Sequence, residues 1–323
     1  MSFWTSKIKI ENIEIPRFMA APMDGFIDSP MRQMIRMFSK EELLFTEMRH
    51  PETIINEKEG LSLKFKDIER PLCFQFSTNR TTFIKEALDK VLAKKIDMLN
   101  LNVGCPARNV TLAGAGSALM AKPKILETII KKIIEDIGGK VPFTIKMRAG
   151  FKEKNAPEIA KLAEDLGIDA IIIHPRTKVQ GYTGEPDTEI VKKIKEQSKI
   201  PIIVSGNIDS FEKAKQVFEK TGVDGFMIGR ALIGAPWKLK EITDNIAGKE
   251  FTISQKEKIE VAIKHLKLVV KFYGEGRFYN IKQQIPNYIK NITGAAQIRR
   301  DLLESRTAQE LEDKLKELVL SLS

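Results

Sequence analysis

Cys105 is the residue of this chain whose type and position best suit it to catalysis. It lies between Gly104 and Pro106, directly after an apolar run that ends at Val103 and ahead of a glycine-rich segment. A thiol with an ordinary pKa of about 8.5 is mostly protonated at neutral pH, so it can act as an acid as well as a nucleophile. Cys73 lies inside another apolar run, where cysteine usually only packs.

Two other chemistries of Cys105 would need partners that are scarce in this chain. The only histidines are His50, His174 and His265, so a Cys/His zinc site has no support and we expect no metal. A hydrolase pair of Cys105 with His174 stays open, although no third residue to orient the histidine is evident.

Polar side chains also stand at or near the end of each of eight apolar runs. One polar end is expected of any loop, but eight of them indicate a constructed site. In chain order they are Asp24, Glu47 and Arg49, Gln75, Asn102, Lys146 and Arg148, His174 and Arg176, Ser205 and Asn207, and Arg230.

The last two of these endings predict a phosphate site. Gly206 and Gly229 would let the backbone approach a ligand and present N–H groups to it, and Arg230 adds a guanidinium that can bind two phosphate oxygens. A phosphorylated cofactor or substrate is therefore expected. Tight turns alone are the other explanation of the two glycines.

The elements that carry these residues alternate between strands and helices. Amphipathic patterns predict helices over Lys124–Ile137, Asn155–Leu166, Thr188–Gln197 and Phe211–Lys220. The apolar runs are nearly continuous, as strands buried on both faces are. They span Phe18–Met23, Leu43–Met48, Pro71–Phe76, Asp97–Val103, Phe143–Arg148, Ala170–His174, Pro201–Ser205 and Gly225–Gly229.

Eight strands that alternate with helices predict a (β/α)8 TIM barrel, and a doubly wound open sheet is the alternative. Active sites of TIM barrels lie at the carboxyl ends of the strands, with phosphate held after the seventh and eighth. The polar strand ends would therefore meet in one site.

The strand pattern stops near residue 247. We expect a catalytic barrel over 1–247 and an all-helical domain over 248–323, with helices near 254–272, 279–291 and 307–321. Between Val261 and Arg300 stand eight basic residues and one acidic residue, interleaved with aromatic side chains, so this segment carries +7 of the formal net charge of +10. Such clustering suits a polyanion, most plausibly nucleic acid, although a solvated lysine-rich face is the alternative.

The composition, 42% hydrophobic and 30% charged over 323 residues, excludes a disordered or fibrous chain. No apolar stretch is long enough to cross a membrane, and the first residues do not resemble a signal peptide. Two cysteines cannot form a disulfide framework, so we expect a cytoplasmic protein.

The strand-end segments resemble those of the tRNA-dihydrouridine synthase family, bacterial type, whose members are FMN-dependent enzymes that reduce particular uridines of tRNA. The resemblance runs from about Pro16 to the C-terminal helices. Its most specific segments are Ala21–Arg32, Asn102–Pro106, Lys146–Gly150, His174–Thr177 with Gln180, Tyr182 and Gly184, and Met227–Arg230.

The resemblance implies FMN as cofactor, with NADPH or, less often, NADH as reductant. It places Pro22, Met23 and Asp24 along the isoalloxazine ring, and Gln75 and Lys146 at the polar edge of the ring. It places His174 on the ribityl or ring side. The phosphate would be held by Ser205, Gly206, Asn207, Gly229 and Arg230.

The resemblance also implies a reaction in which a hydride passes from flavin N5 to C6 of a uracil while Cys105 protonates C5. Asn102 would orient the uracil. The basic helical segment matches the C-terminal tRNA-binding domain of the family, in which Tyr288 and Arg299 occupy recognisable positions, and it would hold the tRNA body. Further candidate substrate contacts are Arg148, Arg176, Gln180 and Tyr182.

Several positions depart from the family pattern, among them Pro175 for glycine, Asn100 for an acid, and Ser205-Gly206-Asn207 for Asn-Gly-Asp. Two other functions stay open. One is an FMN-dependent dehydrogenase of the dihydroorotate or dihydropyrimidine type that acts on a free base. The other is an RNA-binding protein without redox chemistry. The target uridine is not evident from the residues.

Overall fold

Eight parallel strands form the barrel in the computed structural model of this chain, which describes residues 2–322. Their spatial order is β3-β10-β9-β8-β7-β6-β5-β4, and the backbone N–H of Ala20 donates to the carbonyl of Leu43 at 3.0 Å where the sheet closes. The expected barrel is therefore confirmed and the open sheet is excluded. The strands are β3 (Phe18–Ala20), β4 (Leu44–Arg49), β5 (Leu72–Phe76), β6 (Met98–Val103), β7 (Phe143–Gly150), β8 (Ala170–Thr177), β9 (Ile202–Ser205) and β10 (Gly225–Ile228).

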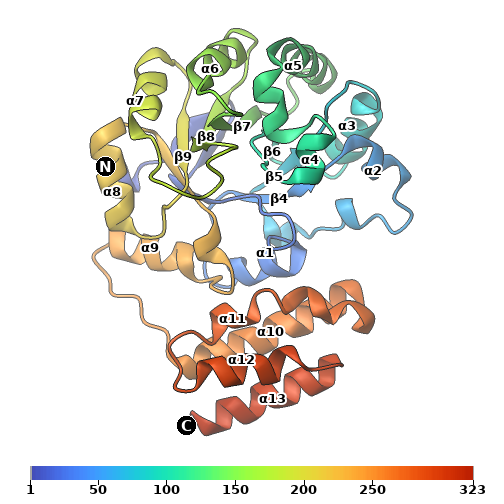
Figure 1. The fold of residues 1–323 in the computed structure, drawn as a ribbon, viewed down its shortest axis with the longest axis vertical. Coiled ribbons are helices and arrows are strands. Elements are labelled where there is room, and N and C mark those ends of the chain that lie inside the picture. Colours follow the sequence, from blue (N-terminus) through green and yellow to red (C-terminus); the bar gives the residue numbers. More distant parts are fainter. Residues whose placement is uncertain (1, 323) are drawn as a thin grey trace. The chain divides into compact units, whose positions relative to one another are not determined.

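Helices follow the strands and lie around them (Figure 1). The four helices predicted between the later strands are confirmed to within a few residues. In α5, Leu126 and Ile130 belong to the buried face, while Ile125 is 40% exposed. The helices around the strands are α2 (Pro51–Asn56), α3 (Ile84–Leu92), α4 (Arg108–Leu112), α5 (Pro123–Ile137), α6 (Ala156–Asp165), α7 (Thr188–Gln197) and α8 (Phe211–Thr221).

A hairpin that the sequence analysis did not predict precedes the barrel. It consists of β1 (Ile8–Ile10) and β2 (Ile13–Ile15), whose isoleucines alternate with polar residues. Ile8, Ile10 and Ile15 join the cluster of side chains inside the barrel, and Ile8 lies against Gly225, the first residue of β10. The hairpin therefore closes the end at which the strands begin.

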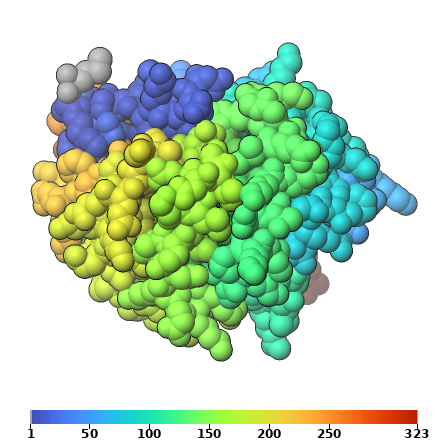
Figure 2. Space-filling view, turned by 90° about the horizontal axis from the view of Figure 1, so that it is seen from above, coloured from blue at the N-terminus to red at the C-terminus, as the bar shows by residue number. Residues whose placement is uncertain are grey.

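Aromatic rings fix the first residues beside the last barrel helix. Phe3 stacks on Phe218 of α8 with ring centroids 4.0 Å apart, and Trp4 meets Phe211 edge to face. Figure 2 shows the blue start of the chain next to the yellow part, with the colours running in sequence order from cyan through green to yellow around this face.

Along the strands, the side chains that point into the barrel change from apolar to polar. Successive inward positions lie two residues apart. In β6 they are Met98, Asn100 and Asn102, and in β8 Ile172 is followed by His174. The apolar layer packs on the hairpin, and the polar residues collect at the carboxyl ends.

The contacts divide the chain into two compact units. One comprises the residues up to Met23 and Glu41–Gly229, and the other comprises Asp24–Lys40 and the chain from Arg230 onward. In the second unit α10 contacts both α1 and α13, and it begins with a capping box of Ser254 and Glu257. Its helices are α1 (Ser29–Arg36), α9 (Lys238–Ile246), α10 (Gln255–Tyr273), α11 (Ile285–Tyr288), α12 (Ala295–Leu303) and α13 (Ala308–Ser321).

The prediction of one helix near 279–291 is wrong. A 3-10 helix, Glu275–Ile281, is followed by the short α11, and α12 was not predicted. Pro286 stands in the first turn of α11, where its missing N–H is tolerated, whereas it would interrupt a longer helix. Gly294, at φ +72°, separates α11 from α12.

The remaining 3-10 segments are short: Phe3–Thr5, Leu61–Leu63, Asp67–Glu69, Gly116–Ala121 and Arg230–Leu232. Among the described residues, no helix combines the length and apolar character needed to span a membrane.

Candidate active site

The polar strand ends of β5 to β8 meet at the carboxyl end of the barrel. Gln75 and Asn102 are joined by a hydrogen bond of 2.9 Å, and Asn102 stands opposite Lys146 in the pairing of β6 with β7. Arg148 stands opposite His174 in the pairing of β7 with β8. Residues from four neighbouring strands therefore face one space, as the sequence predicted.

Cys105 stands in a loop whose backbone is held from two sides. The side-chain oxygen of Asn102 accepts from the N–H groups of Gly104 (3.1 Å) and Cys105 (2.8 Å). Ser117 donates its hydroxyl (2.8 Å) and its N–H (3.0 Å) to the carbonyl of Cys105. Gly116 must lack a side chain, because a Cβ there would come within 2.9 Å of that carbonyl. The half-buried thiol is thus presented on a fixed backbone.

Sequence reasoning missed Ser117. Its hydroxyl is fully buried beside Cys105, twelve residues along the chain. The glycine-rich segment that ends at Gly116 was the available signal, since glycines mark close backbone approach.

Arg148 joins the Cys105 loop to the loop that follows β8. Its side chain is 2% exposed and donates to three carbonyls. Nε donates to Gly104 (2.9 Å), while Nη1 donates to Thr177 (3.0 Å) and Gly181 (2.9 Å). The guanidinium therefore holds two loops that are far apart in sequence.

Arg176 is buried in the same way and braces the other end of that loop. Nε and Nη2 donate to the carbonyl of Gly184 at 3.0 and 2.7 Å. Nη1 lies 3.3 Å from Nε2 of His174 and 3.4 Å from the side-chain oxygen of Asn207.

The loop between these arginines presents Tyr182. Thr177 and Gln180 exchange hydrogen bonds, with the Thr177 N–H donating to Oε1 of Gln180 at 2.8 Å. The Tyr182 ring is 54% exposed, its centroid lies 6.1 Å from that of His174, and Cζ of Arg148 lies 5.6 Å from it. An aromatic face is therefore available at the rim.

Lys146 brings a half-buried positive charge into the site. Three effects together lower the pKa of its ammonium from 10.5 to about 8: burial lowers it most, the guanidinium of Arg148 also lowers it, and Cys105 raises it. No carboxylate pairs with Lys146 in the part of the chain that the structure describes. The ammonium is therefore suited to an electron-rich group of a ligand.

A glycine turn follows β9, whereas Gly229 after β10 is not in the left-handed region. Gly206 has φ +101°, and a Cβ there would lie 2.6 Å from Cδ2 of His174, so no side chain fits. Asn207, after the buried Ser205, is also left-handed at φ 56°. A Cβ on Gly229 would only touch Ala21 and Met23, at 3.7 and 3.8 Å.

The other residues predicted to bind the cofactor follow β3 and β10. Pro22 and Met23 are half-buried, directly after β3. Asp24 and Arg230 are exposed and belong to the second unit, so their part in cofactor binding stays a prediction.

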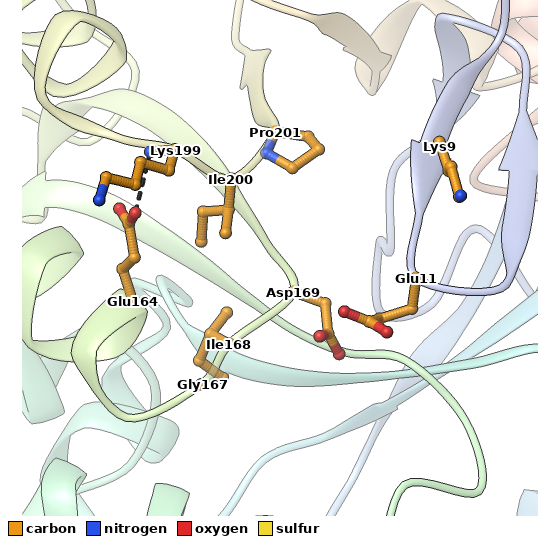
Figure 3. A pocket seen from close by; sticks show the side chains of 9 residues that line it. All are labelled: Lys9, Glu11, Glu164, Gly167, Ile168, Asp169, Lys199, Ile200 and Pro201. Carbon is orange, nitrogen blue, oxygen red and sulfur yellow. Dashed lines mark hydrogen bonds between the residues drawn. The ribbon is translucent and has the colours of Figure 1, made fainter.

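A pocket of about 580 Å³ lies at the opposite end of the barrel, beside the hairpin (Figure 3). There Glu11 faces Asp169, which precedes β8. Burial raises the pKa of Asp169, the N–H of Phe143 opposes this, and Glu11 adds to the rise. None of the predicted site residues lines this pocket.

The comparisons with known proteins identify the same family that the strand-end segments resemble. A family model described as Dihydrouridine synthase (Dus) matches residues 19–322. The chain is 29% identical to a probable tRNA-dihydrouridine synthase 1 of Synechocystis sp., covering 98% of this chain and 91% of that protein. It is 32% identical to tRNA-dihydrouridine synthase B of Pseudomonas aeruginosa, covering 91% and 90%.

Two solved structures share the barrel fold. A variant of NCR from Zymomonas mobilis has a TM-score of 0.57 at 14% identity, covering 80% of this chain and 96% of that chain. Histamine dehydrogenase from Rhizobium sp. 4-9 has a TM-score of 0.60 at 12% identity, covering 83% and 51%. At these identities the likeness concerns the fold alone.

Proposed function

The chain belongs to the dihydrouridine synthase family, and from this we propose that it is a tRNA-dihydrouridine synthase, an oxidoreductase that reduces particular uridines of tRNA to 5,6-dihydrouridine. The observation that carries the proposal is the fixed Cys105 loop next to the unpaired ammonium of Lys146. Such an enzyme works on tRNA, so we also propose a cytoplasmic location.

The residues at the strand ends fit FMN as the cofactor. Lys146 supplies a half-buried cation for the electron-rich edge of the ring, and Gln75 on β5 offers an amide. The turn at Gly206 leaves room for no side chain, so its backbone can approach a phosphate. We assign the ring to Pro22, Met23, Gln75 and Lys146, the ribityl side to His174, and the phosphate to Ser205, Gly206, Asn207 and Gly229.

Bound FMN, once reduced by NADPH or NADH, would supply the hydride that C6 of the uracil receives. Cys105 holds the proton on Sγ and delivers it to C5, so the C5=C6 double bond gains one hydride and one proton. The thiolate that is left regains a proton from solvent. The loop keeps the backbone of Cys105 in one place during this transfer, because the two carbonyls and two N–H groups of Gly104 and Cys105 are all hydrogen-bonded.

Asn102 would orient the uracil through the loop that it shapes. Its oxygen already accepts two N–H groups of the loop, and its Nδ2 donates to Oε1 of Gln75. The uracil must leave its stack to reach Cys105. The exposed ring of Tyr182 gives it an aromatic surface at the rim, and Gln180 keeps that loop in shape.

Arg148 and Arg176 would act on tRNA by holding the loops that border the site. Replacing Arg148 with lysine is expected to lower kcat/KM for tRNA by about 10- to 100-fold, because one ammonium cannot span three carbonyls in two loops. Steady-state rates with unmodified tRNA measure this. Lys178→Arg, a charge-conserving change on the same loop, should stay within about two-fold, and a wild-type rate for Arg148→Lys would contradict the proposed role.

The second unit would bind the tRNA body through its exposed cations. Of the eight basic residues in the segment, five are exposed: Lys264, Lys267, Lys271, Lys290 and Arg300. Lys282 is instead engaged with the carbonyls of Leu303 and Ser305. Tyr288 is fully buried, with its hydroxyl oxygen 3.0 Å from Nδ1 of His265, whereas Tyr279 is 55% exposed.

Changing Lys264, Lys271 and Lys290 together to glutamine should weaken tRNA binding about 10- to 100-fold near 0.1 M salt and flatten its log–log salt dependence by about two units, because fewer counterions are released. Binding titrations at several salt concentrations measure both. A control with the same loss of charge replaces Lys85, Lys131 and Lys161, exposed on α3, α5 and α6. If both triple variants show the wild-type slope, the segment is only a solvated face.

One experiment separates this function from its rivals. The purified protein is loaded with FMN, reduced with NADPH without oxygen, and mixed with tRNA that lacks dihydrouridine. Reoxidation by tRNA but not by free uracil or orotate supports the synthase. Reoxidation by a free base alone indicates the dehydrogenase, and a protein that takes up no flavin indicates an RNA-binding protein.

A further inference from the structure

A column of hydrogen bonds runs inside the barrel across β5, β6 and β7. The hydroxyl of Thr144 donates to the carbonyl of Leu99 at 3.2 Å, and Nδ2 of Asn100 donates to that hydroxyl at 2.8 Å. Nε2 of Gln75 donates to Oδ1 of Asn100 at 2.7 Å, and Nδ2 of Asn102 donates to Oε1 of Gln75 at 2.9 Å. Asn102 in turn holds the Cys105 loop.

All these bonds point in one direction, and both ends of the column fix that direction. At the upper end, the N–H groups of Gly104 and Cys105 can only donate. At the lower end, the Thr144 proton has two neighbours, the Leu99 carbonyl and the more distant sulfur of Met98 at 3.7 Å, and both can only accept. Turning any one of the three amides by half a turn would oppose two donors or two acceptors.

The column has no access to water that could replace a lost bond. Asn100 and Thr144 are fully buried, and Gln75 is 1% exposed. A buried donor or acceptor that loses its partner keeps the full cost of its desolvation. The orientation of the Gln75 and Asn102 amides therefore depends on Asn100 and Thr144, which lie below them in the column.

We infer that Thr144 and Asn100 are positioning residues: they fix which polar atom of the Gln75 amide meets the cofactor and, through Asn102, hold the loop of the proton donor. This inference rests on the proposed function for the cofactor and on the structure alone for the loop. Neither residue touches the substrate, because both lie below Gln75 and Asn102 in the column.

Replacing Thr144 with valine, which has nearly the same shape but no hydroxyl, tests the inference. Asn100 then loses its acceptor, and the amides above it are held from the upper end alone, through the N–H groups of Gly104 and Cys105. We expect FMN to bind about 10-fold more weakly with a shifted absorption spectrum, and kcat to fall about 10-fold while KM for tRNA stays within about two-fold. Thr144→Ser keeps the hydroxyl and should restore wild-type values.

A measurement on protein without cofactor tests the effect of Thr144 on the Cys105 loop. In FMN-free protein, the rate of Cys105 alkylation by iodoacetamide should change about three-fold or more in Thr144→Val and return in Thr144→Ser. Ile145→Val is the matched control, because it removes a buried methylene from the same strand on the other face. It should lower the melting temperature but leave the spectrum and the alkylation rate unchanged.

Wild-type FMN affinity, spectrum and alkylation rate in Thr144→Val would overturn the inference, as would equal changes in Ile145→Val. If Thr144→Val does not fold, Asn100→Asp decides. Aspartate can accept from both Gln75 and Thr144, so the Gln75 orientation is kept and alkylation should stay near wild type; a change as large as about ten-fold contradicts the inference. If the wild type takes up no flavin, the proposed function fails while the alkylation comparison still tests the column.

Discussion

Replacing Cys105 with alanine is expected to slow the formation of dihydrouridine by about 100-fold or more, because general acids contribute about 10²- to 10⁴-fold. Binding of FMN and tRNA should persist. The contacts of the loop with Asn102, Ser117 and Arg148 all use backbone atoms of Gly104 and Cys105, which alanine retains. A single-turnover assay of the reduced, FMN-loaded protein with unmodified tRNA measures the rate.

Cys73→Ala is the matched control, since it removes the other thiol of the chain. Cys73 is fully buried inside the barrel, and burial raises the pKa of its thiol well above the ordinary range. Its loss should lower the melting temperature by a few degrees, about 2–5 °C, and leave turnover unchanged. Equal turnover of the wild type and Cys105→Ala would remove Cys105 from the role of acid.

The barrel was predictable because its strands are buried on both faces. A nearly continuous apolar run marks such a strand, and its polar end marks the mouth of the barrel. The hairpin of Ile8–Ile10 and Ile13–Ile15 escaped prediction because each strand is only three residues long. Two alternating isoleucines are too short a pattern to stand out, and only the barrel interior that they cover gives them a place.

The chemistry of the site was predictable, but the partners of its residues were not. An arginine at a strand end suits a substrate contact as well as a structural one, and only the fold brings the carbonyls of Gly104 and Gly181 to Arg148. In the sequence, Asn100 is distinguished not only by its departure from the family pattern. It stands two residues before Asn102 in an apolar run, so the two must share the inward face of the strand.

Lys146→Met is expected to lower kcat by about 100- to 1,000-fold, the usual effect of removing one electrostatic contact from a transition state. The same residue predicts how FMN binding depends on pH. Its ammonium has a pKa of about 8 in the protein, so the charge is present below this pH and is lost as the pH rises through it. FMN affinity of the wild type should therefore fall above a pH of about 8, and titrations of Lys146→Met should lack this fall.

The stability of Lys146→Met should change in the opposite direction from its activity. The folded pKa of about 8 lies below the ordinary value of 10.5, so between these values the unfolded chain binds more protons, and the free energy of unfolding of the FMN-free wild type rises with pH. At neutral pH the fold carries the cost of burying the ammonium. Methionine removes that cost, so FMN-free Lys146→Met should gain about 1–3 kcal/mol in the free energy of unfolding at pH 7, and less above pH 10. Denaturant titrations at pH 7 and pH 10 measure both effects. A variant that loses activity while its stability rises cannot have lost that activity by misfolding, whereas a loss of stability at pH 7 would show that the ammonium already has a partner within the protein.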